Sequence, residues 1–209
     1  MQILQQNDPS AAKIAAEILR NNGIICFATE TVYALACDAS SDIAVAALYK
    51  IKQRDLKKPI AVFVQDLKTA KEFLNFSQAE EAIAKKFMPG MISLVLQKKN
   101  LIQQKIKISS LLNNNDKNLA LRIPDHQFCL ELLNEFKGII AATSANPSNQ
   151  AAATDFEQAQ KYFLNKIDLI IDGGVCLHKI ASTVLKVEDG IKIIRSGLIT
   201  KNQLELCIS

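Results

Sequence analysis

The amino-acid sequence predicts an α/β fold of the mixed α+β kind, in which helices flank a twisted, open, mixed sheet. Short continuous apolar runs alternate with amphipathic helical patterns along nearly the whole chain, which indicates strands that helices cover. Some predicted strands follow one another without an intervening helix, so the sheet should be mixed rather than purely parallel. The length of 209 residues suits a single domain, 1–209, with one substantial core.

The first half of the chain begins with a helix and a buried strand. Asp8, Pro9 and Ser10 precede apolar residues at helical spacing and Gly23 follows them, which predicts a capped helix over 10–22 with proline in its first turn. The wholly apolar run 24–28 is typical of a strand buried on both faces. Similar patterns predict a helix over 42–52, a strand over 60–64, helices over 66–74 and 78–87, and a strand over 92–96.

The second half continues the alternation. The patterns predict a strand over 119–123, a helix over 126–136, a strand over 139–142 and a helix over 155–164. Strands over 168–172, 182–187 and 191–194 follow. The segment 100–117, rich in Asn, Lys and Gln, should be a loop, and no internal repeat or low-complexity tail is present.

Composition narrows the class of protein. The chain is 49% hydrophobic and 22% charged, as in an ordinary globular protein, and its net charge of +4 indicates a mild preference for anions. Five scattered cysteines without a C-x-x-C pair and only two histidines argue against a metal site and for a reducing compartment. No apolar run approaches the ~18 residues of a membrane helix, so the expected location is the cytoplasm, away from membranes.

Polar and basic clusters follow several predicted strands, where open sheets usually bind ligands. Residues 29–33 place two threonines and Glu30 after the first strand, although ordinary loop chemistry explains such a cluster equally well. Residues 50–58 contain five cations against the single acid Asp55, a run that is either a solvated face or an anion site. Arg122 and Arg195 each end a predicted strand, which favours the anion site.

Several known catalytic motifs are absent. The sequence has no P-loop, no G-x-G-x-x-G and no G-x-S-x-G elbow. Neither histidine has an obvious nucleophile beside it. Covalent catalysis is therefore not expected.

Seven short blocks, taken in order over about residues 10–200, resemble the YrdC family of threonylcarbamoyl-AMP synthases. The ordered pair K-x-R and S-x-N among them is the characteristic active-site set of that family. The resemblance is to its shorter members, which lack an extra C-terminal domain. The blocks are Thr29-Glu30-Thr31-Val32-Tyr33, Lys52-Gln53-Arg54, Pro89-Gly90, Arg122-Ile123-Pro124, Ser144-Ala145-Asn146-Pro147-Ser148, Ser182-Thr183-Val184 and Arg195-Ser196-Gly197.

The resemblance implies a YrdC-like fold with a concave, basic cavity, in which L-threonine, bicarbonate or CO2 and ATP react to give L-threonylcarbamoyladenylate and pyrophosphate. By the same resemblance, ATP would be a substrate that brings Mg²⁺ with it, held mainly by phosphates and water. Lys52 and Arg54 would be the catalytic cations on the phosphates. Threonine would contact Thr31, Arg122, Ser144 and Ser182, and ATP would contact Arg54, Lys58, Asn118, Asn146, Thr154 and Arg195.

The product would pass to a tRNA-modifying transferase complex that builds threonylcarbamoyladenosine, and weak binding of tRNA by this chain is a further expectation. Two positions depart from the family pattern near the threonine: Phe63 stands where many members have histidine, and Ala181 where many have glutamate. The alternative function is a tRNA or double-stranded RNA binding module of the same fold. Three tyrosines, no tryptophan and a modest excess of positive charge make that alternative the weaker one.

Overall fold

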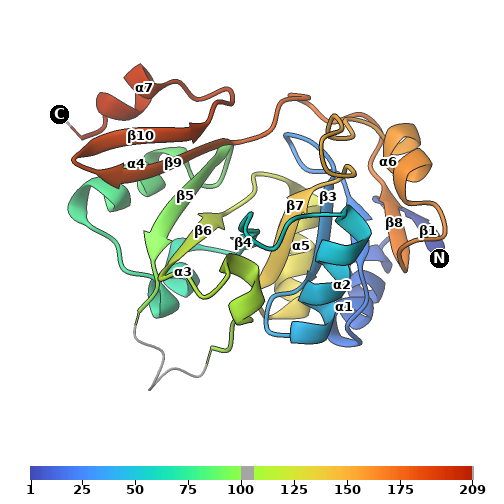
Figure 1. Cartoon of the computed structure of the whole chain (residues 1–209). Coiled ribbons are helices and arrows are strands. Elements are labelled where there is room, and N and C mark those ends of the chain that lie inside the picture. The colour runs from blue at the N-terminus through green and yellow to red at the C-terminus, as the bar shows by residue number, and fades with distance from the viewer. Residues whose placement is uncertain (100–105, 209) are drawn as a thin grey trace.

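The computed structural model describes residues 1–99 and 106–208, which form a ten-stranded mixed sheet flanked by helices (Figure 1). The strand order is β1-β8-β2-β3-β7-β4-β6-β5-β9-β10. The strands are β1 (Gln2–Gln5), β2 (Ile25–Phe27), β3 (Ala34–Asp38), β4 (Ala61–Phe63), β5 (Ile92–Gln97), β6 (Asn118–Arg122), β7 (Ile140–Ser144), β8 (Leu169–Asp172), β9 (Thr183–Glu188) and β10 (Gly190–Arg195). The helices are α1 (Ala11–Arg20), α2 (Asp42–Lys52), α3 (Leu67–Phe73), α4 (Gln78–Phe87), α5 (Gln127–Phe136), α6 (Phe156–Phe163) and α7 (Lys201–Glu205), with a 3-10 turn η2 (Ser110–Asn113).

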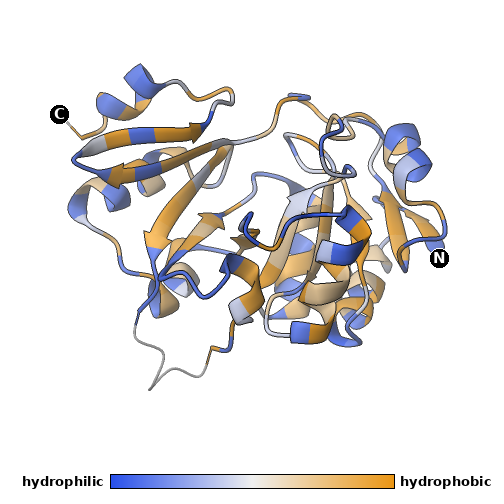
Figure 2. Cartoon of the chain, viewed as in Figure 1, coloured by the Kyte–Doolittle hydropathy of each residue, from blue (hydrophilic) through white to orange (hydrophobic). Residues whose placement is uncertain are grey.

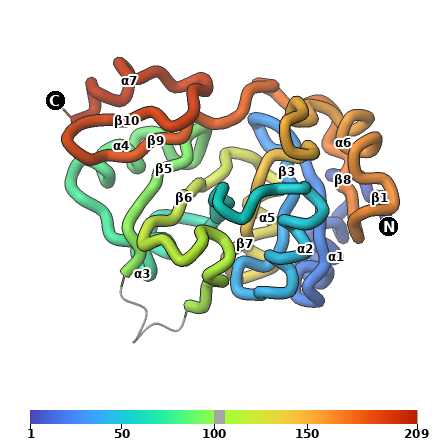
Figure 3. Tube along the Cα trace, in the orientation of Figure 1, coloured from blue at the N-terminus to red at the C-terminus, as the bar shows by residue number. Residues whose placement is uncertain are grey.

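Strand pairing confirms the expected mixed sheet. The parallel pairs are β1 with β8, β2 with β8, β4 with β6, and β5 with β9. The antiparallel pairs are β2 with β3, β3 with β7, β4 with β7, β5 with β6, and β9 with β10. The chain trace runs from an N-terminus beside β1 to a C-terminus beside α7 and β10, so the two ends lie at opposite edges of the sheet (Figure 3).

Apolar side chains pack on both faces of the sheet, because successive residues of a strand point to opposite sides. On one face, α1 and α5 pack on alternate residues of β2, β3, β7 and β8, such as Phe27 and Ile140. On the other face, residues such as Leu48 of α2 and Ile83 of α4 join Leu35, Leu94 and Leu121 in a larger core. Figure 2 shows the strands mainly in hydrophobic colours and the outer helix surfaces with hydrophilic stretches, as this packing requires.

The fourteen elements expected from the sequence are all present, with ends shifted by at most two residues. Four more elements were not expected: β1, β3, η2 and α7. The expected loop over 100–117 contains η2, whereas its residues 100–105 lie outside the described residues. The expected helix start at residue 10, with proline in the first turn, is wrong by one residue. The helix α1 begins at Ala11, so Pro9 precedes it, and Asp8 Oδ1 accepts from both the backbone N–H and the hydroxyl of Ser10.

No helix within residues 1–99 and 106–208 combines the length and the apolar character needed to cross a membrane.

Candidate active site

A cavity of about 400 Å³ opens on the face of the sheet that carries the α1–α5 core. Ala34, Phe63 and Ala142 belong both to the cavity wall and to that core, so the two lie side by side on one face. The wall continues over β6, β5 and β9, where Ala120, Ser93 and Val184 alternate with residues buried on the opposite face. The alanines and the serine among these residues leave space above the sheet, because their side chains are short.

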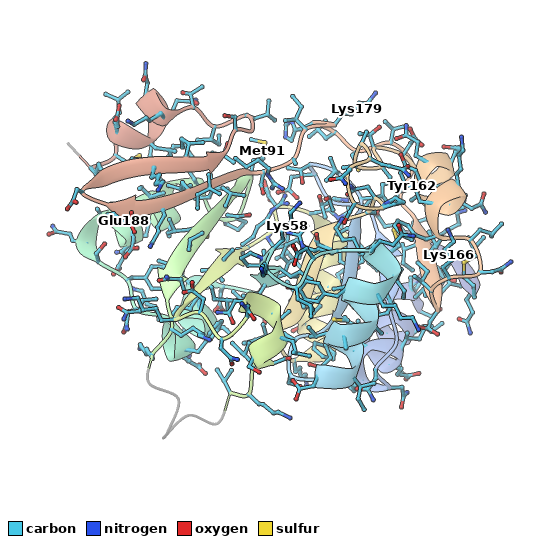
Figure 4. The ribbon with its side chains drawn as sticks, viewed as in Figure 1. Lys58, Met91, Tyr162, Lys166, Lys179 and Glu188 are labelled. Carbon is cyan, nitrogen blue, oxygen red and sulfur yellow. The ribbon has the colours of Figure 1, made fainter. Side chains whose placement is uncertain are left out.

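The wall of this cavity is rich in cations. Five basic residues line it, and no Asp or Glu does among the residues that the structure describes. Figure 4 shows Lys58 in the centre of the view, in the loop that leads from α2 to β4. Such a wall favours an anionic ligand, since each cation is repelled by the others until an anion arrives. The five are Arg54, Lys57, Lys58, Arg122 and Arg195.

Arg122, at the end of β6, is held by three polar contacts. Its Nη2 donates to Glu30 Oε1 at 2.7 Å and to Thr31 Oγ1 at 2.8 Å. Its Nε donates to the carbonyl of Gly90 at 3.2 Å. Arg122 and Glu30 are each 5% exposed and form a buried ion pair. Nη1 makes no hydrogen bond to any residue that the structure describes, and it is therefore the donor available to a ligand.

Arg195, at the end of β10, is tied to Ser182 just before β9. Its Nε and Nη2 donate to the Ser182 carbonyl at 3.1 and 2.9 Å, and Nη2 also donates to Ser182 Oγ at 3.0 Å. The Ser182 hydroxyl lies 2.9 Å from the hydroxyl of Ser93 on β5. These contacts fix one arginine and two hydroxyls in the cavity wall.

Arg54 lies in the loop after α2, which ends at a left-handed Gln53. Its Nε donates to the carbonyl of Lys58 at 3.0 Å and its Nη2 to that of Pro59 at 2.8 Å. The side chain therefore braces the loop that carries Lys58 into the cavity wall. Lys58 itself is part of that wall.

Lys52 does not line the cavity. The side chain is 1% exposed, and Nζ donates to Asn146 O and Asn146 Oδ1 at 3.0 Å each and to the Ser144 carbonyl. Asn146 Oδ1 also accepts from Ser144 Oγ at 2.7 Å. Lys52 thus fastens the end of α2 to the turn after β7, and only the Ser144 member of this cluster reaches the cavity wall.

Like charges and burial act together in this site. Burial, with Arg54 and Arg195 nearby, lowers the pKa of Lys52 to about 7. Burial also lowers the pKa of Arg195, and Arg122 and Arg54 lower it further. The three acceptors around Nζ act in the opposite direction for Lys52, because only the ammonium form carries three protons.

The structure brings together Arg54, Lys58, Arg122, Ser144, Ser182 and Arg195 in the cavity wall. Thr31 lies directly behind this wall, fully buried, with its hydroxyl on Arg122. Asn118 and Thr154 are not brought to the wall. The amide of Asn118 bonds Asp116 at the far end of β6, and Thr154 precedes α6, where it contacts Gln158. Asn146 reaches the wall only through Ser144.

Phe63 and Ala181, the two departures from the family pattern expected near the threonine, both lie in the cavity wall. The ring centroid of Phe63 is 5.5 Å from Arg122 Cζ, so a cation–π contact occupies this position. Ala181 adds no polar group beside Ser182. Sequence reasoning gave no role to Glu30 or to Ser93. A single serine between apolar neighbours in the strand 92–96 was the available signal for Ser93.

No group of three or more His, Cys, Asp or Glu side chains within residues 1–99 and 106–208 is arranged to hold a metal ion.

Comparisons with known proteins identify the family. The Sua5/YciO/YrdC family model, described as "Telomere recombination", matches residues 17–197. The threonylcarbamoyl-AMP synthase of Bacillus subtilis is 34% identical over 207 residues, which cover 98% of this chain and 58% of that protein. A Methanocaldococcus jannaschii protein is 31% identical over 194 residues, which cover 91% of this chain and 87% of the relative.

Solved structures agree. The structure of P. abyssi Sua5 complexed with L-threonine has a TM-score of 0.91 and 27% identity, and the match covers 99% of this chain and 60% of that one. E. coli YciO shares the fold, with a TM-score of 0.84 at 20% identity over 97% of this chain and 98% of the other. The chain thus spans about 60% of the length of the B. subtilis and P. abyssi relatives. On the extent of the family match and these similarities, the chain belongs to the Sua5/YciO/YrdC family.

Proposed function

We propose that this protein is a nucleotidyltransferase that makes L-threonylcarbamoyladenylate from L-threonine, bicarbonate or CO2 and ATP, with Mg²⁺ carried by the nucleotide. The observation that carries the proposal is the cavity wall, which offers five cations and no carboxylate among the described residues. A site that aligns an amino-acid carboxylate with a triphosphate needs this distribution of charge. The family members named threonylcarbamoyl-AMP synthase and the threonine complex of P. abyssi Sua5 support the same assignment.

The amino acid would bind at the Arg122 end of the cavity. Nη1 of Arg122 would receive the carboxylate, and the hydroxyls of Ser182 and Ser144 stand in the same wall for its other polar groups. Thr31 would act from behind, by holding Nη2 of Arg122. The Phe63 ring supplies an apolar wall next to the guanidinium in place of a further polar contact.

The nucleotide would bind through Arg54, Lys58 and Arg195. Arg195 has its Nε and Nη2 committed to Ser182, so its Nη1 would face the phosphates. We assign Lys52 a positioning role on Ser144 and Asn146, because its ammonium is buried among their oxygens. Asn118 and Thr154 remain proposed ATP contacts that need either an extended nucleotide pose or movement of their side chains.

In the proposed reaction, the amine of threonine adds to CO2 and loses a proton, which gives a carbamate. A carbamate oxygen then attacks the α-phosphorus of ATP, the bond to the bridging oxygen breaks, and pyrophosphate leaves with the electron pair. The protein contributes no nucleophile. It holds two mutually repelling anions in line and places Arg54, Lys58 and Arg195 where negative charge grows on the phosphates.

The product is a mixed anhydride that hydrolyses readily in water. It would pass to a tRNA-modifying transferase complex in the cytoplasm, and tRNA itself would bind this chain only weakly.

The test is an assay of the purified protein with threonine, bicarbonate and Mg-ATP. Pyrophosphate release that depends on all three, together with the adenylate detected by mass spectrometry, is the expected result. Arg54→Ala should remove most of this activity, whereas Lys161→Ala, a matched change at an exposed lysine on α6, should not. Absence of threonine-dependent pyrophosphate from folded protein that binds tRNA tightly would instead favour the RNA-binding alternative.

A further inference from the structure

We propose that Glu30 is a positioning residue for the amino-acid substrate: it locks the Arg122 guanidinium in one orientation and leaves Nη1 as the nitrogen that receives the substrate carboxylate. This inference rests on the proposed function and assigns a role to a side chain that does not itself line the cavity.

The donors of Arg122 are divided between protein and cavity. Nη2 has two hydrogens, and both are used, on Glu30 Oε1 and on Thr31 Oγ1. The single hydrogen of Nε is used on the Gly90 carbonyl. Only the two hydrogens of Nη1 remain without a partner among the described residues. A side chain with a four-bond stem would otherwise sample several rotamers, so these contacts decide which edge of the guanidinium faces the ligand.

Glu30 also joins three segments of the chain that surround the amino-acid end of the cavity. Its Oε1 accepts from the backbone N–H of Asp125, at 3.2 Å, just beyond β6. Its backbone carbonyl accepts from the N–H of His178, at 3.0 Å, in the connection that leads to Ala181 and Ser182. One residue in the β2–β3 turn thereby sets the relative positions of Arg122 and of the Ser182 side of the wall.

Arg122 is the charged partner of the buried Glu30 carboxylate. The carboxylate is 5% exposed, and its Oε2 has no hydrogen-bond partner among the residues that the structure describes. A buried carboxylate with one oxygen unsolvated is stabilised chiefly by its ion pair, so each member of the pair holds the other in place. The ion pair also fixes the direction of the Nη1 hydrogens, which decides where a substrate carboxylate can bind the guanidinium.

Glu30→Gln is the sharpest test. An amide has the size of the carboxylate, but it removes the charge that attracts Nη2 and puts a buried N–H2 group where Oε2 lies without a partner. We expect the threonine KM to rise at least about 10-fold, with kcat changed less than about threefold and the ATP KM less than about twofold. Glu30→Asp, which keeps the charge on a shorter stem, should fall between wild type and Glu30→Gln.

A double-mutant cycle with Arg122→Lys separates positioning from a general structural defect. If Glu30 acts through Arg122, Arg122→Lys should raise the threonine KM clearly less in the Glu30→Gln background than in the wild type. Fully additive effects would overturn the inference. So would a Glu30→Gln protein with a normal threonine KM, or, should Glu30→Gln not fold in a thermal melt, a Glu30→Asp protein with a normal threonine KM.

Calorimetric titration of the wild type with threonine distinguishes this failure from failure of the proposed function. Wild-type protein that neither binds threonine nor turns it over refutes the function and, with it, the role given to Glu30. Wild-type protein that does both, beside unaltered Glu30 variants, refutes the role of Glu30 alone.

Discussion

Arg122→Lys should weaken threonine binding selectively, and the structure gives the size of the effect. Three contacts to Glu30, Thr31 and Gly90 already use three donor hydrogens of Arg122. An ammonium has three hydrogens in total, so a lysine that satisfies the protein has none left for the ligand. Loss of the Nη1 donors should cost roughly 1.5–3 kcal/mol, the usual worth of a hydrogen bond to a charged group. At ~1.4 kcal/mol per tenfold, the threonine KM should rise about 10- to 150-fold.

The assay is pyrophosphate release with threonine varied at saturating Mg-ATP and then ATP varied at saturating threonine. The ATP KM should change less than about twofold, because the nucleotide is assigned to other cations. Arg20→Lys on α1, the same chemical change at an arginine that does not line this cavity, is the matched control. A mutant that loses ATP affinity while threonine saturation stays normal would place Arg122 in the nucleotide subsite and refute the division proposed above.

Three further predictions concern other parts of the site. Arg54→Ala should lower kcat about 100-fold with a smaller change in the ATP KM, as expected for a group that stabilises growing charge; a change in the ATP KM alone would make Arg54 a ground-state binder. Burial lowers the pKa of Lys52 to about 7, below its unfolded value, so the unfolded state binds more protons above pH 7. The unfolding free energy of wild type minus that of Lys52→Met should therefore rise by up to about 1.4 kcal/mol per pH unit between pH 7 and 9. Urea melts that give the same difference between the two proteins at pH 7 and at pH 9 would contradict this. Finally, burial raises the pKa of Cys26, Cys37, Cys129 and Cys176, so Ellman's reagent at pH 8 should label mainly Cys207 in the native protein without loss of turnover. Rapid labelling of several thiols in the native protein would contradict the burial of these four cysteines. Loss of turnover on labelling would contradict the expectation that catalysis needs no cysteine.

Local pattern was enough to place most elements but not the weakest strands. The helical spacing in α2 and α4 and the apolar runs of β2 and β5 are encoded by neighbours in the sequence, and these elements appear where expected. β1 contains only two apolar residues, and it is a strand because β8, more than 160 residues away, offers it a parallel partner. β3 directly follows the polar turn at 29–33, so the sequence pattern does not distinguish the start of this strand from the turn.

The sequence by itself determined the family resemblance and the expectation of a basic cavity, since ordered motifs preserve types of side chain. It also named six residues of the cavity wall: Arg54, Lys58, Arg122, Ser144, Ser182 and Arg195. Only the tertiary structure decided which of these side chains lie together and what each one contacts. Arg54, Arg122 and Arg195 come from three distant segments and line one cavity because β4, β6, β5, β9 and β10 are consecutive in the sheet. Lys52 is two residues from Arg54 and yet does not line the cavity, because the left-handed turn at Gln53 lies between them and buried oxygens hold its ammonium. Burial and strand order arise from contacts far apart in the chain, and no local pattern records them.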